Sequence, residues 1–198
     1  MSGGDRETLS VYAKQAERYA NAFDTARKDP WLEAFITALP AGAPVLELGC
    51  GPGRIAALLK AAGLEVDAVD ASAEMADVAK RQHDVDVRVA SFDQITGTDC
   101  YDGIWANFSL LHAPKAEMLG HLARLATALR PGGRVHIGLK EGDGEARDGL
   151  GRFYAYYREE ELRGLLSDVG WTVTQVDRGA SEGLDGTVAP WLIVTAHG

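Results

Sequence analysis

The sequence predicts a single α/β domain in which helices cover both faces of a mostly parallel sheet. The apolar pattern switches repeatedly between helical and strand spacing, and no internal repeat is present. A buried strand at residues 45–48 runs directly into a glycine-rich turn at residues 49–53. With 198 residues, of which 46% are hydrophobic, the chain can bury one full core, so we expect one domain over residues 1–198.

The composition disfavours several classes of partner. Twenty basic residues against 29 acidic residues give a net charge of −9, which disfavours binding to nucleic acid or to an anionic membrane. Residues 1–7 are polar and no apolar run approaches membrane-spanning length, so we expect a cytoplasmic protein that does not insert into membranes. The two cysteines, Cys50 and Cys100, lack the spacing of a metal site or of a disulfide framework, so we expect neither.

Residues 1–40 are expected to form an N-terminal helical cap. A first helix is predicted at about residues 10–26, because apolar and aromatic side chains recur there on one face. These side chains are Tyr12, Ala16, Tyr19, Ala20 and Phe23. Asp29 can cap a second helix that begins with Pro30 and stops at Pro40.

Five strands, which alternate with helices, are predicted for the parallel part of the sheet. They lie at residues 45–48, 64–69, 85–90, 101–107 and 134–139. A helix follows the glycine turn and ends near Gly63, a second begins after the capping residue Ser72, and a third spans residues 115–129.

The C-terminal part is expected to contain a loop, a helix and two more strands. Residues 140–151 hold four glycines among charged residues and are predicted to be a long flexible loop. Together with the aromatic segment that follows, residues 140–157 are a candidate lid or acceptor loop. A helix at residues 158–169 and an antiparallel pair of strands at residues 171–176 and 188–196 complete the chain.

The predicted binding site lies where the parallel strands end. Asp70 follows the second strand at the separation where an acidic residue contacts ribose hydroxyls, which is also typical of nicotinamide-binding domains. Two details favour a nucleotide-like ligand other than a nicotinamide dinucleotide. The third glycine of the dinucleotide fingerprint is replaced by Arg54, and Glu47 lies just before the turn, where it suits a positively charged ligand.

Residues 47–53, Glu-Leu-Gly-Cys-Gly-Pro-Gly, resemble the first motif of class I S-adenosylmethionine-dependent methyltransferases. Further matches follow in the family's order at Asp70, at residues 91–93, at residues 101–107 and at residues 129–133. The resemblance spans residues 44–139 and is closest to small stand-alone bacterial members. It implies a Rossmann-like seven-stranded sheet of order 3-2-1-4-5-7-6 with strand 7 antiparallel. It also implies S-adenosylmethionine as cofactor and S-adenosylhomocysteine as product.

The resemblance further implies which residues contact the cofactor. Gly49 and Gly51 would contact the methionine part, Asp70 the ribose, and Asn107, through its carbonyl, the ammonium group. Met75 and Phe92 would flank the adenine and Asp93 would bind its amino group. The full predicted set is Glu47, Gly49, Cys50, Gly51, Gly53, Asp70, Ala71, Met75, Ser91, Phe92, Asp93, Asn107 and Phe108.

Catalysis and acceptor binding are predicted with less direct signals. His112 follows the fourth strand and is a candidate general base, with a cap or lining role as the open alternative. Tyr19 is a second catalytic candidate, although the tyrosines of the first helix can also be core residues. The candidate acceptor residues are Tyr12, His112, Lys140, Arg147 and Tyr154.

The expected function is methyl transfer to a small-molecule acceptor by in-line displacement, in a monomer or homodimer. Residues 107–110, Asn-Phe-Ser-Leu, differ from the N/D-P-P-Y/F signature of many enzymes that methylate amino groups. Methylation of tRNA or protein and non-catalytic cofactor binding remain alternatives, and a nicotinamide oxidoreductase is a more remote one.

Overall fold

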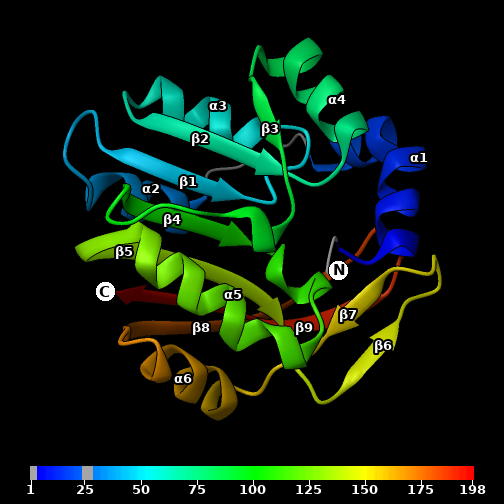
Figure 1. The fold of residues 1–198 in the computed structure, drawn as a ribbon. Coiled ribbons are helices and arrows are strands. Elements are labelled where there is room, and N and C mark those ends of the chain that lie inside the picture. Colours follow the sequence, from blue (N-terminus) through cyan, green and yellow to red (C-terminus); the bar gives the residue numbers. More distant parts are fainter. Residues whose placement is uncertain (1–3, 24–28) are drawn as a thin grey trace.

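A seven-stranded sheet forms the centre of the computed structural model, which describes residues 4–23 and 29–198 (Figure 1). The strand order is β3-β2-β1-β4-β5-β9-β8. The first five strands pair in parallel, whereas β9 is antiparallel to both β5 and β8, which confirms the predicted topology. The strands are β1 Pro44–Leu48, β2 Glu65–Asp70, β3 Val87–Val89, β4 Tyr101–Asn107, β5 Leu129–Lys140, β8 Thr172–Glu182 and β9 Val188–His197.

Helices cover both faces of this sheet. They are α1 Arg6–Phe23, α2 Pro30–Thr37, α3 Arg54–Ala61, α4 Ala73–His83, α5 Lys115–Ala128 and α6 Glu159–Asp168. Side chains of α5 and α6 share one apolar cluster with the sheet, while α2 and α3 pack with it in another. The alternation of side chains along β1 serves both clusters, because Leu46 faces the first and Val45 the second.

The helix α1 and a small hairpin lie at the edge where the parallel strands end (Figure 1). The hairpin consists of β6 Glu145–Arg147 and β7 Phe153–Ala155, which pair antiparallel. Small side chains of α1, Ala16 and Ala20, pack against Met75 and Val78 of α4. This edge is where an open parallel sheet binds its ligands.

The predicted flexible loop at residues 140–151 is wrong in its central part, because β6 forms there and pairs with β7. Tyr154, Ala155 and Tyr157 are buried against the main core, so the segment after the glycines is anchored to the body of the protein. The apolar pattern did not predict β6, because this strand has only three residues, all of them exposed. It depends on a partner strand that begins six residues further on.

Several element boundaries differ from the prediction. The first helix begins at Arg6 rather than near residue 10, because the carboxylate of Asp5 accepts a hydrogen bond of 2.8 Å from the Thr8 N–H and caps it. Its predicted end at residue 26 and the side chain of Phe23 lie outside what the structure describes. The strand β8 runs to Glu182 rather than to residue 176, since β9 pairs with it along that whole length.

Three further boundaries shift by a few residues. The strand β3 spans only residues 87–89, while β5 begins at Leu129, five residues before the predicted start. The second helix ends at Thr37, before Pro40. No helix within residues 4–23 and 29–198 is long and apolar enough to cross a lipid bilayer.

We predict that Gly179→Ala destabilises the fold, because Trp191 of β9 lies directly over Gly179 of β8. A Cβ at position 179 would lie 2.2 Å from Trp191 Cζ2, so the indole or the strand must move. We expect the free energy of unfolding to fall by about 1–3 kcal/mol in urea titrations, the usual cost of overpacking.

Gly164→Ala is the matched control, because an added Cβ at this position in α6 would meet nothing within 4 Å. We expect a gain of about 0.5–1 kcal/mol there, since alanine favours the helix. A Gly179→Ala protein as stable as the wild type would contradict this account of Trp191.

Candidate active site

Three glycines shape the turn between β1 and α3. Gly49, Gly51 and Gly53 have φ angles of 75°, 53° and 81°, in the left-handed region that other residues rarely adopt. An added Cβ at Gly49 would lie 2.3 Å from Ser109 Cβ, and one at Gly53 would lie 2.7 Å from Ala79 Cβ. The turn therefore fits closely between β4 and α4 and leaves its backbone accessible to a ligand.

The carboxylate of Asp70, at the end of β2, holds this turn in place. Its Oδ2 accepts a hydrogen bond of 2.8 Å from the Gly51 N–H, and its Oδ1 accepts one of 2.9 Å from the Ser72 N–H. Burial raises the pKa of Asp70, while these backbone donors lower it. Asp70 also lines a pocket, so the same carboxylate faces a ligand site.

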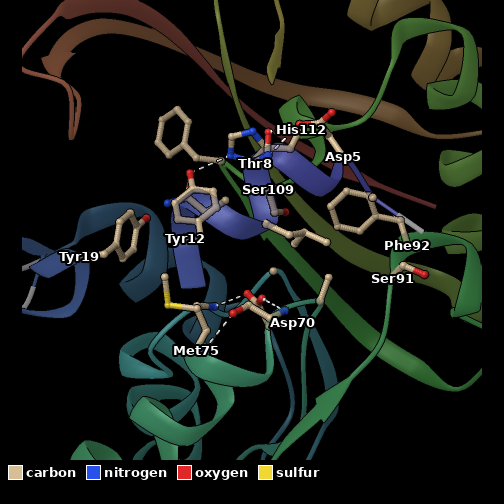
Figure 2. A pocket seen from close by; sticks show the side chains of 18 residues that line it. Asp5, Thr8, Tyr12, Tyr19, Asp70, Met75, Ser91, Phe92, Ser109 and His112 are labelled. Carbon is tan, nitrogen blue, oxygen red and sulfur yellow. Dashed lines mark hydrogen bonds between the residues drawn. The ribbon is translucent and has the colours of Figure 1, made fainter. Parts of the chain in front are cut away.

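This first pocket lies between the sheet edge and α1. Figure 2 shows Asp70 and Met75 on one side of it, His112 on the opposite side, and Ser91 with Phe92 at one end. Nine of the predicted cofactor residues line it. They are Gly49, Gly51, Asp70, Ala71, Met75, Ser91, Phe92, Asn107 and Phe108.

A second, larger cavity of about 340 Å³ adjoins the first. Seven residues line both spaces, namely Tyr12, Tyr19, Gly49, Gly51, Asn107, Phe108 and His112. The second cavity extends from them to Lys140, Arg152, Tyr154 and Trp191. We call the shared part, marked by Tyr12, Tyr19 and His112, the junction.

A chain of hydrogen bonds crosses the junction. His112 Nδ1 lies 2.7 Å from the carbonyl oxygen of Phe153, which can only accept, so Nδ1 carries the proton. His112 Nε2 is then the acceptor for the Tyr12 hydroxyl at 2.8 Å. Arg152 Nη1 donates in turn to the Tyr12 oxygen at 3.2 Å.

The electrostatics of this chain keep His112 neutral near pH 7. Burial lowers the pKa of His112 to about 4, with a smaller contribution from Arg152. Burial also raises the pKa of the Tyr12 hydroxyl, which therefore stays protonated. Arg152 forms a buried ion pair with Asp148 at 2.6 Å, in which the two side chains are 3% and 5% exposed. The junction thus presents a neutral imidazole whose basic nitrogen faces Tyr12.

Glu47 is the buried acid beneath the glycine turn. It is 3% exposed, and burial together with the nearby Asp70 raises its pKa well above the usual range. Among the residues that the structure describes, its Oε2 has no hydrogen-bond partner, nor has Nε1 of Trp105, its register neighbour on β4. Both residues line the second cavity.

The helix α1 is fastened to the hairpin at the mouth of the first pocket. Thr8 Oγ1 accepts a hydrogen bond of 2.7 Å from the Phe153 N–H and donates one of 2.6 Å to Asp5. Arg147 donates to both carboxylate oxygens of Asp5, at 2.7 Å and 2.9 Å, and lowers its pKa far below the usual range. Tyr12 and Tyr19 come to the junction on this helix.

The remaining predicted site residues occupy other places. Glu47 and Cys50 line the second cavity together with Lys140 and Tyr154. Gly53, Asp93 and Arg147 line neither space. Gly53 instead packs on α4, Asp93 accepts a hydrogen bond from Ser91 Oγ, and Arg147 pairs with Asp5 rather than facing an acceptor.

Some lining residues were not identified from the sequence. Asp5 and Thr8 carry a local signal, since an aspartate three residues before a threonine can cap a helix. Trp191 carries no such signal, because its position depends on how β9 pairs with the sheet. Within the described part of the chain, no group of three or more His, Cys, Asp or Glu side chains is arranged to hold a metal ion.

Related proteins match the central part of the chain or most of its length. Residues 45–133 match the family model described as "Methyltransferase domain". An uncharacterised methyltransferase of Staphylococcus carnosus is 25% identical over 82% of this chain and 81% of its own length. The malonyl-[acyl-carrier protein] O-methyltransferase of Enterobacter lignolyticus is 31% identical over 65% of this chain, which spans only 52% of that protein.

Solved structures also resemble almost the entire chain, and one of them holds two bound molecules. The 1,6-didemethyltoxoflavin-N1-methyltransferase of Burkholderia thailandensis, with bound 1,6-didemethyltoxoflavin and S-adenosylhomocysteine, is 27% identical. It aligns with a TM-score of 0.77 over 96% of this chain and 87% of its own. The sheet order, the family model and this structure agree with the motifs of the sequence, so the chain belongs to the class I S-adenosylmethionine-dependent methyltransferases.

Proposed function

We propose that this methyltransferase acts on a small molecule bound in the second cavity while the cofactor occupies the first pocket. The observation that carries the proposal is the junction, where the two spaces share Tyr12, Tyr19 and His112. Two adjoining sites that meet at one point provide a place where a donor and an acceptor can react. The acceptor side is enclosed by α1, β7 and β9, which favours a small molecule over a tRNA or protein chain.

The first pocket fits S-adenosylmethionine on several independent features. Asp70 offers a carboxylate for two ribose hydroxyls, and Met75 and Phe92 provide apolar faces for an adenine. Glu47 lies beneath the same glycine turn but lines the second cavity, so it faces the space beside this pocket rather than the pocket itself. At Gly49, Ser109 occupies the space that a Cβ would need. Because glycine has no side chain, the backbone of the turn can contact the ligand.

When bound, S-adenosylmethionine supplies an electrophilic methyl group on a sulfonium. The task of the chain is to hold the acceptor in line and to exclude water. Tyr12 and Tyr19 bring two aromatic rings, 5.5 Å apart at an angle of 88°, over the junction. Because both come from α1, docking of α1 closes the reaction space.

His112 is the group that receives the acceptor proton in this proposal. Its Nδ1–H is fixed by the Phe153 carbonyl, so the basic Nε2 points at Tyr12 and the junction. An acceptor proton reaches Nε2 either directly, by replacing Tyr12, or through the Tyr12 hydroxyl. Arg152 donates a hydrogen bond to the Tyr12 oxygen, and its charge opposes, without cancelling, the rise in the pKa of Tyr12 that burial causes.

The cofactor assignment predicts that Asp70→Asn weakens S-adenosylhomocysteine binding at least tenfold in calorimetry. The amide loses the charge that strengthens hydrogen bonds to the ribose and to the Gly51 N–H, each worth about 1.5–3 kcal/mol. Asp67→Asn is the control on the same strand, because Asp67 pairs with Arg88 and Tyr101 and does not line the pocket.

We expect Asp67→Asn to retain the wild-type affinity for S-adenosylhomocysteine. NAD should give no binding heat with any of these proteins. Binding of NAD without binding of S-adenosylhomocysteine would overturn the cofactor assignment and revive the oxidoreductase alternative.

The base assignment predicts that His112→Gln lowers kcat by about a hundredfold, the lower end of general-base effects. The wild-type kcat should be constant between pH 6 and pH 8 and fall as pH approaches 4, where His112 gains a proton. S-adenosylhomocysteine release from acceptors turned over by the wild type measures both. His197→Gln, at the far end of β9, should leave kcat unchanged. Unaltered turnover in His112→Gln, with cofactor affinity preserved, would leave His112 only a lining role.

A further inference from the structure

We propose that the acceptor carries an acidic oxyanion group, such as a carboxylate, and that Lys140 binds it. This inference rests on the proposed function, because it names the substrate class of the second cavity. Lys140 is the last residue of β5 and lines the second cavity, but not the first pocket. It therefore lies on the acceptor side of the junction.

Lys140 has no anionic partner among the residues that the structure describes. Its Nζ lies 3.9 Å from the centre of the Tyr154 ring, and no carboxylate of residues 4–23 or 29–198 lies within ion-pair distance. Two other cations near the acceptor side are paired, Arg152 with Asp148 and Arg147 with Asp5. Lys140 therefore brings a positive charge into this wall of the cavity without an ion-pair partner among the described residues.

A half-buried ammonium without a counter-ion is costly once a ligand removes its water. Burial already lowers the pKa of Lys140, and the positive Arg152 lowers it further, while Asp185 and Asp148 act in the opposite direction from a distance. A neutral acceptor would displace water from Nζ and provide little in exchange. An acidic group would replace that water and supply the missing charge.

The wall beside Lys140 favours a flat molecule. Carboxyl side chains also line the second cavity, at Asp29, Glu47 and Glu182, but none of them lies within ion-pair distance of Lys140 Nζ, so we place the acidic group of the acceptor at Lys140. Trp191 pairs with Lys140 across β5 and β9 and is held from behind by Gly179 and by the edge of the Trp31 ring, 5.6 Å away. Its indole and the Tyr154 ring are fixed aromatic surfaces beside the ammonium, so aromatic acids are suitable probes.

The test compares three acids with their amides on protein saturated with S-adenosylhomocysteine. The probes are benzoate, salicylate and 4-hydroxybenzoate against benzamide, salicylamide and 4-hydroxybenzamide, titrated by ligand-observed NMR. We expect at least one acid to bind tenfold more tightly than its amide in the wild type. In Lys140→Met the affinities for that acid and its amide should agree within threefold. Lys140→Arg, which keeps the charge, should retain part of the preference for the acid.

Lys60→Met is the matched control, because Lys60 is exposed on α3 and lines neither space. It should keep the wild-type preference for acids. Saturation with S-adenosylhomocysteine ensures that the probes do not simply occupy the carboxylate position of the cofactor. Equal binding of acids and amides, absence of binding by every acid at 10 mM (roughly the weak-affinity limit of such probes), or an unchanged preference in Lys140→Met would each overturn the proposal.

Failure of the proposed function gives a different result. If S-adenosylhomocysteine itself does not bind, the cofactor assignment fails, and the same six probes titrated without it still decide whether Lys140 selects acids. If the wild type then binds acids more tightly than amides and Lys140→Met does not, the cavity is an anion site in a protein whose methyl donor is not S-adenosylmethionine. Should Lys140→Met fail to fold, Lys140→Gln is the second variant, because it removes the charge and keeps a polar side chain, and it should lose the preference for acids in the same way.

Discussion

The carboxylate of Asp70 is the group on which the architecture of the site depends. It connects the turn after β1 to the start of α4 by accepting hydrogen bonds from Gly51 and Ser72. Parallel strands bring these segments to one edge of the sheet, and a buried carboxylate is stable there only because backbone donors surround it. The glycine turn has its shape because neighbouring strands and α4 leave no space for side chains at Gly49 and Gly53. The first pocket is thus formed by the same contacts that join the first two β-α units.

The acceptor side is formed by elements far apart in the sequence. The helix α1 contributes Tyr12, the segment after β4 contributes His112, and the hairpin contributes the carbonyl that orients the imidazole. The helix is held by two alanines against α4 and by polar contacts to the hairpin. Exposed ion pairs contribute only about 0–1 kcal/mol, so the pairing of Arg147 with Asp5 aligns α1 more than it stabilises it. Alignment is what a shared reaction space requires, because Tyr12 must reach both cavities.

Most residues of the first pocket could be predicted from the sequence, and those of the second cavity only in part. The order of the sheet and the lining residues from Gly49 to Phe108 follow from local signals, in which strand, turn and helix succeed one another within about twenty residues. The hairpin and the length of β8 depend on pairing with distant strands, which the apolar pattern does not report. Arg147 has the residue type of an acceptor ligand, yet the cap of α1 places a carboxylate where it pairs with that guanidinium. Trp191 reaches the cavity because a glycine lies opposite it on the adjacent strand.

The hydrogen bond from His112 to the carbonyl of Phe153 has a consequence for how this protein can vary. The tautomer of the imidazole is set by a backbone atom, so it survives any side-chain replacement at position 153 that keeps β7 in register. A substitution scan of the hairpin would therefore miss this contribution altogether. Insertion or deletion of one residue between β6 and β7 acts differently, because it shifts which carbonyl faces Nδ1 and which N–H faces Thr8. The orientation of the imidazole therefore depends on the length of the hairpin loop rather than on its composition.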